Sequence, residues 1–180
     1  MKDEKKSQVE MHKNFFDRCE KAIEDGFYLE AIFHEYAAIE SRLEVILGVL
    51  GMPCNKNLQS NIRKDINISQ RINCLKGIMN NSSIFEKSKL DNKFFKSLEN
   101  WITERNGIIH GLYKNEKKYK PRMKNAKELA EQGCDHAKKL YNEASRLRKI
   151  RKNHKDLLMN VNELCKGNCK FLKEEFICQK

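Results

Sequence analysis

The chain of 180 residues carries 36 lysines and arginines against 25 aspartates and glutamates, which gives a formal net charge of +11. This length suits a single domain, and the charge favours a polyanionic partner such as RNA, DNA, an acidic protein or an anionic membrane surface. The sequence shows no apolar signal core and no apolar run of membrane-spanning length. We therefore expect a cytoplasmic protein without a membrane partner, whose seven cysteines are mostly reduced thiols.

The predicted elements are all helices. The chain has only two prolines and eight glycines, and no strand-like alternation stands between turn residues. Apolar residues at steps of three and four predict helices over about residues 9–24, 28–50, 62–79 (or 69–79) and 88–113, with Asp25-Gly26 as a helix stop. Further helices are predicted from residue 123 and over about 156–177. The fold class is therefore an all-α, up-down bundle of about five to six helices.

The most informative stretch is residues 101–113, at the end of the fourth predicted helix. Arg105 falls on its apolar stripe, seven residues after Leu98 and seven before Leu112. Burying an unpaired guanidinium is costly, so this position needs either a buried carboxylate partner or a role in the wall of a site. Glu40 lies on the apolar stripe of the second predicted helix and is the natural partner.

Polar residues beside Arg105 share one edge of the same helix. Asn106 and His110 are four residues apart, and Tyr113 follows three residues later. The long side chain of Arg105 is able to swing towards this edge. On the second predicted helix, His34 and Glu35 flank the apolar stripe and are auxiliary candidates for the same groove.

The segment Arg105-Asn106-Gly107-Ile108-Ile109-His110 resembles the Arg-x4-6-His motif of the HEPN superfamily. These are small helical-bundle domains, and many are metal-independent RNases. The likeness covers roughly residues 8–115 and implies a HEPN-like bundle there, with residues 116–180 as a C-terminal helical extension packed on the same domain. It also implies a homodimer with the site at its interface, no cofactor and no metal.

The resemblance also implies chemical roles. RNA is cut without a metal when its own 2′-hydroxyl attacks the adjacent phosphate. His110 suits the proton transfer, and the fork of Arg105 suits two phosphate oxygens. Asn106 completes the catalytic set by orienting the phosphate or His110, with Tyr113 and Glu40 as auxiliary residues.

One departure from the family concerns the subfamily. In toxins paired with nucleotidyltransferase antitoxins, a tyrosine commonly falls two residues after the motif histidine. Leu112 occupies that place here, and the tyrosine is Tyr113. The role as a toxin or phage-defence effector, and an antitoxin or regulatory protein as partner, therefore stay open.

Two basic segments are predicted to contact an RNA backbone, although charge runs are more often solvated linkers. The residues concerned are Lys114, Lys117, Lys118, Lys120, Arg122, Arg148, Lys149, Arg151 and Lys152. Near the C-terminus, His154, Cys165, Cys169 and Cys178 suggest zinc but lack a CxxC pair, so no metal site is predicted.

Three functions remain in competition. The first is the metal-independent endoribonuclease, which the resemblance favours. The second is a non-catalytic helical module that binds nucleic acid or a partner protein. The third is a bundle of unrelated origin in which Arg105 and Glu40 form a purely structural pair.

Overall fold

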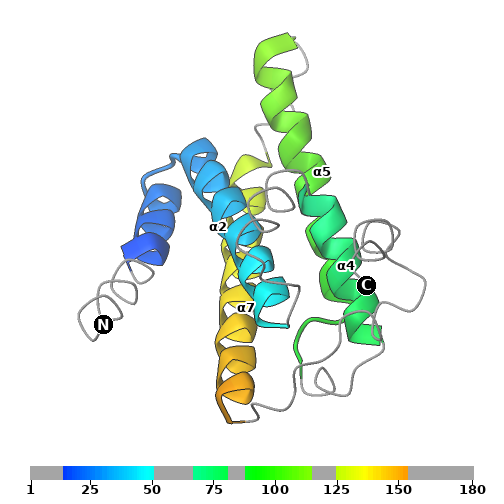
Figure 1. Ribbon diagram of the computed structural model, residues 1–180. Helices are drawn as coiled ribbons and strands as arrows, with labels where there is room; N and C mark the ends of the chain where they lie inside the picture. The colour runs from blue at the N-terminus through cyan, green and yellow to red at the C-terminus, as the bar shows by residue number, and fades with distance from the viewer. Residues whose placement is uncertain (1–13, 51–66, 81–87, 115–124, 154–180) are drawn as a thin grey trace, which may run out of the picture. The chain divides into compact units, whose positions relative to one another are not determined.

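The computed structural model describes residues 14–50, 67–80, 88–114 and 125–153 (Figure 1). The helical elements are residues 14–24, α2 (Tyr28–Val49), α4 (Ile68–Asn80), α5 (Asn92–Lys114) and α7 (Ala126–Asn153). No strand occurs in these four ranges, so the all-α prediction is confirmed for them. None of the helices described there is both long and apolar enough to cross a membrane.

The first helical segment ends where the sequence predicted. Gly26 adopts a φ of 82°, a left-handed conformation that glycine reaches without steric cost. Its N–H donates to the carbonyl of Ile23 at 3.1 Å, and the N–H of Phe27 donates to the carbonyl of Ala22 at 2.7 Å. These two bonds satisfy the last carbonyls of the helix and allow α2 to begin at once.

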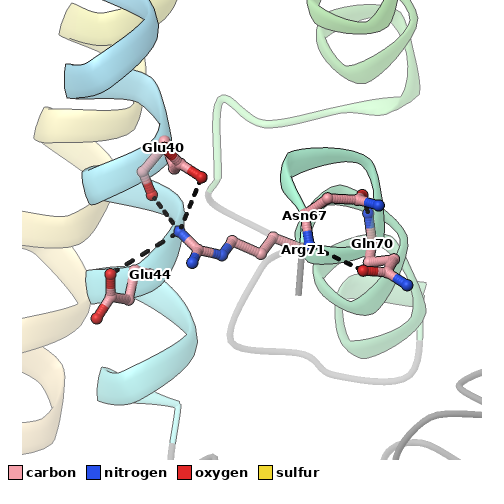
Figure 2. A network of polar contacts seen from close by, with 5 residues as sticks. All are labelled: Glu40, Glu44, Asn67, Gln70 and Arg71. Carbon is pink, nitrogen blue, oxygen red and sulfur yellow. Dashed lines mark hydrogen bonds and ion pairs between the residues drawn. The ribbon is translucent and has the colours of Figure 1, made fainter. Parts of the chain in front are cut away.

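Side chains cap the next two helices. The backbone N–H of Gln70 donates to Asn67 Oδ1 at 3.0 Å, and the N–H of Asn67 donates to Gln70 Oε1 at 2.8 Å, a capping box at the start of α4 (Figure 2). Asp91 Oδ1 accepts the N–H of Phe94 at 2.7 Å. Because this cap sets the start of α5, the helix begins at Asn92 rather than near the predicted residue 88.

The chain divides into two compact units, and each contains parts of the helices described above. Unit 1 comprises residues 1–39 and 98–138, and unit 2 comprises residues 40–97 and 139–180. Helices α2, α5 and α7 each contribute to both units. The units thus combine segments from both sides of the boundary predicted between residues 115 and 116.

In unit 2, a nearly buried arginine corrects one prediction. The side chain of Arg71 on α4 is 8% exposed, and its Nη1 donates to the carbonyl oxygen of Glu40 at 3.2 Å. The same nitrogen lies 3.8 Å from the carboxylates of both Glu40 and Glu44 (Figure 2). Glu40, predicted to be the partner of Arg105, is therefore the partner of Arg71. The two glutamates are one turn apart on α2, so they meet the same cation.

Unit 1 is built around a buried tryptophan. Trp101 on α5 is 1% exposed, and its indole N–H donates to the carbonyl of Leu129 on α7 at 2.7 Å. Other apolar side chains of unit 1 on α2, α5 and α7 are also buried: Ala31, Ile32, Ile39, Leu98, Ile102, Ile108, Ala130 and Ala137. The buried Trp101 therefore fixes the position of α5 against α7 one helical turn before Arg105.

Candidate active site

Arg105 packs on two aromatic rings. Its guanidinium carbon lies 4.0 Å from the ring centroid of Tyr36 and 5.5 Å from that of Phe33, both on α2. The two rings are three residues apart and so share one helix face. A guanidinium over an aromatic face is held by the ring quadrupole, which explains how a cation occupies a largely apolar stripe.

The motif residues follow one another along α5. Arg105 Nη1 donates to Asn106 Oδ1 at 3.0 Å, and both side chains are half-buried. His110, one turn beyond Asn106, is exposed. The hydrogen bond draws the guanidinium towards the helix edge that carries the imidazole. The arrangement therefore offers a fixed cation and an accessible proton carrier on neighbouring turns.

The auxiliary candidate His34 has other neighbours. Its side chain is 52% exposed, and its Nε2 lies 3.6 Å from the carboxylate of Glu30, one turn earlier on α2. The imidazole also meets the ring of Phe15 edge to face, with centroids 6.4 Å apart. Among the described residues, these contacts direct His34 towards its own helix and the segment 14–24.

Glu35 is a buried acid, whereas the sequence predicted an auxiliary residue of the groove beside Arg105. It is fully buried in unit 1, with its carboxylate against Gly133 of α7. A Cβ at position 133 would lie 2.6 Å from Trp101 Cζ2 and 2.9 Å from Glu35 Cδ, so only glycine leaves the required space. Both carboxylate oxygens are without a hydrogen-bond partner among the described residues. Burial raises the pKa of Glu35 to about 9, so the group is neutral at pH 7.

Two thiols lie in the surroundings of Glu35. Cys19 and Cys134 are buried and free. Burial, with smaller effects of Glu35 and Cys134, raises the pKa of Cys19 to about 12. Burial likewise raises the pKa of Cys134. Both sulfurs are therefore protonated and poor nucleophiles at pH 7.

The part of the chain that the structure describes has no group of three histidine, cysteine or acidic residues suited to a metal ion. The earlier zinc candidates, His154, Cys165, Cys169 and Cys178, lie outside the described residues.

Two of the predicted RNA-binding residues, Arg148 and Lys149, are exposed on α7 in unit 2. The structure adds Arg42 of α2, whose guanidinium carbon lies 5.7 Å from the ring centroid of Tyr141. Burial lowers the pKa of Arg42, and the charge of Arg148 lowers it further. The sequence did not single out Arg42, because its proximity to Arg148 arises only from the packing of α2 with α7.

The remaining predicted residues lie outside the part that the structure describes in full. Lys117, Lys118, Lys120 and Arg122 fall outside the described residues, as do the side chains of Tyr113, Lys114, Arg151 and Lys152. The candidate site consequently consists of Arg105, Asn106 and His110, with Tyr36 and Phe33 as the support that sequence reasoning missed. A signal was present in the aromatic pair at a helical spacing of three, but nothing in the sequence linked it to Arg105.

No protein-family model, no curated protein and no solved structure matches the sequence. The motif residues and the contacts that surround them are therefore the evidence for function.

Proposed function

We propose that the protein is a metal-independent endoribonuclease of the HEPN type that uses Arg105, Asn106 and His110. The observation that carries this proposal is the position of Arg105. Its guanidinium is stacked on Tyr36 and hydrogen-bonded to Asn106, one turn from an exposed His110. The basic net charge of +11 favours a polyanionic substrate.

The proposed reaction needs only groups that the chain itself carries. The 2′-oxygen of the RNA forms a bond to phosphorus while the bond to the 5′-oxygen breaks. The products are a 2′,3′-cyclic phosphate and a 5′-hydroxyl. An imidazole takes the proton of the attacking hydroxyl or supplies one to the leaving oxygen, and a guanidinium donates to the crowded phosphate.

The stack on Tyr36 favours the phosphate-binding role of Arg105. A guanidinium whose plane is fixed by a ring loses less conformational freedom when it binds an anion. Donors that are already in place stabilise a developing charge without reorganisation at the moment of reaction. Asn106 restricts the guanidinium further through the hydrogen bond of 3.0 Å.

One motif supplies one imidazole, whereas acid and base catalysis together use two. We propose that a second copy of the chain brings its own His110 to the same phosphate across a two-fold axis. The exposure of His110 on α5 is compatible with such a shared site.

Arg105→Ala is expected to lower the rate of RNA cleavage in the presence of EDTA about a hundred- to a thousand-fold, since it removes a positioned donor. The assay uses a labelled RNA with gel separation of the products. Arg18→Ala removes an exposed arginine of the same unit and serves as the control. Circular dichroism establishes that both variants are folded.

Cleavage by Arg105→Ala at the wild-type rate, or cleavage by the wild type only with added divalent metal, contradicts the proposal.

A second candidate function is a non-catalytic nucleic-acid-binding module. The pairing of Arg42 with Tyr141 beside Arg148 favours it, because a stacked arginine near a second one is suited to a phosphate backbone. Salt-sensitive RNA binding without any product would support that candidate.

A further inference from the structure

Phe33 is an exposed aromatic residue beside the cation of the candidate site. Its exposure is 46%, and Phe27, at 60%, is the other large apolar side chain that is similarly exposed among the described residues. A single exposed phenylalanine needs no explanation in a folded protein. Phe33, however, lies with its ring centroid 5.5 Å from the guanidinium carbon of Arg105, so its surface is continuous with the candidate site.

The two rings on α2 differ in depth. Tyr36 is half-buried and holds the guanidinium closely, at 4.0 Å, whereas Phe33 is exposed and holds it at 5.5 Å. Ile32, next to Phe33 in sequence, is fully buried. The face of α2 under Arg105 thus runs from the interior to solvent, and Phe33 is its outer end.

We propose that Phe33 stacks with an unpaired base of the nucleotide whose phosphate Arg105 holds. This inference rests on the proposed function, which makes the ligand RNA. A nucleotide joins its base and its phosphate through one sugar, so a ring and a cation side by side match both parts. Aromatic stacking tolerates every base, because each has a π-face.

The stack makes Phe33 a determinant of specificity. In a duplex both faces of a base are covered by its neighbours, whereas an unpaired nucleotide is able to turn its base onto a protein ring. The site therefore selects unstacked nucleotides without reading their hydrogen-bonding edges. The positive charge of Arg105 next to the ring directs the contact to a nucleotide rather than to an apolar peptide.

Binding of RNA separates this inference from catalysis. The full chain with His110→Ala is titrated against three fluorescent RNAs of equal length. The first is an unstructured single strand, the second is an abasic RNA whose central nucleotides lack bases, and the third is a duplex with a complementary strand. Phe33→Ala in that background is expected to weaken binding of the unstructured RNA about tenfold and to leave the abasic RNA unchanged. Phe33→Trp keeps the stack and is expected to bind like the parent.

Phe27→Ala is the matched control, because it removes another exposed phenylalanine ring from the same unit. If Phe33→Ala binds the unstructured RNA as tightly as Phe27→Ala does, or weakens all three RNAs equally, the inference is wrong. If the chain binds RNA through Phe33 in a base-dependent way but never cleaves it, the proposed nuclease activity is wrong and the stacking role of Phe33 is retained. If the chain cleaves RNA at the same rate with Phe33→Ala, the stacking role is wrong and the nuclease activity is retained.

Discussion

His110→Ala is expected to lower the rate of metal-independent RNA cleavage at least a hundred-fold, and up to about ten-thousand-fold. Imidazole is the side chain whose unperturbed pKa lies nearest neutrality, so its loss removes the proton carrier from the proposed reaction. His110 is exposed on α5, which means that its replacement removes no buried packing. The expected loss is therefore catalytic and leaves the fold intact.

The measurement compares single-turnover rates in EDTA for the wild type and for His110→Ala. Asn100→Ala, an exposed polar residue on the same helix, is the matched control for a change to alanine on α5. RNA binding by His110→Ala is expected to stay within a few-fold of the wild type, because Arg105 still holds the phosphate. Undiminished cleavage by His110→Ala would remove the histidine from the mechanism.

Glu35→Gln is expected to remove a strong pH dependence from the stability of the protein. Burial raises the pKa of folded Glu35 from 4.5 to about 9. Between these two values the unfolded chain releases a proton that the folded chain keeps. The contribution of Glu35 to stability is thus fully present below the unfolded pKa and is lost as the pH rises towards the folded pKa. The slope for one proton is about 1.4 kcal/mol per pH unit.

Urea unfolding at pH 5, 6, 7 and 8 measures this difference. The free energy of unfolding of the wild type is expected to fall at each step relative to that of Glu35→Gln, since glutamine cannot ionise. Glu104→Gln, at an exposed position of α5, controls for the exchange of a carboxyl group for an amide. A difference between Glu35→Gln and wild type that is the same at all four pH values would show that Glu35 is not a buried, neutral acid.

The buried acid and the candidate site share one helix. Glu35 lies against Gly133 of α7, while its neighbour Tyr36 supports the guanidinium of Arg105. Because successive positions of a helix point in different directions, α2 presents one side chain to the interior of unit 1 and the next to the site. The close approach at Gly133 therefore helps to fix the ring on which Arg105 rests.

The local features of the fold were predictable from the sequence. The stop at Gly26 follows from a glycine in the left-handed region, and α2 ends within one residue of its predicted limit, at Val49. Apolar periodicity located α4 and α5 as well. The start of α5 was placed too early, because Asp91 caps the helix. The helix predicted from residue 123 begins at Ala126 as α7.

The partners of charged side chains were not predictable, because they depend on which helices pack together. Glu40 was expected to meet Arg105, whereas Arg71 lies 3.8 Å from it. Arg105 was expected either to pair with a buried carboxylate or to line a site, and its guanidinium lies over two aromatic rings of α2. The contact of Gly133 with Glu35 is likewise a tertiary feature, because it joins α2 to α7.

The chemical ends of the products test the central claim most directly. Wild-type protein incubated with RNA in EDTA is expected to leave 2′,3′-cyclic phosphate and 5′-hydroxyl ends, which mass spectrometry of the fragments identifies. These ends require attack by the 2′-hydroxyl of the RNA itself, the step assigned to Arg105 and His110. Fragments with 3′-hydroxyl and 5′-phosphate ends, or intact RNA after prolonged incubation, would contradict the account.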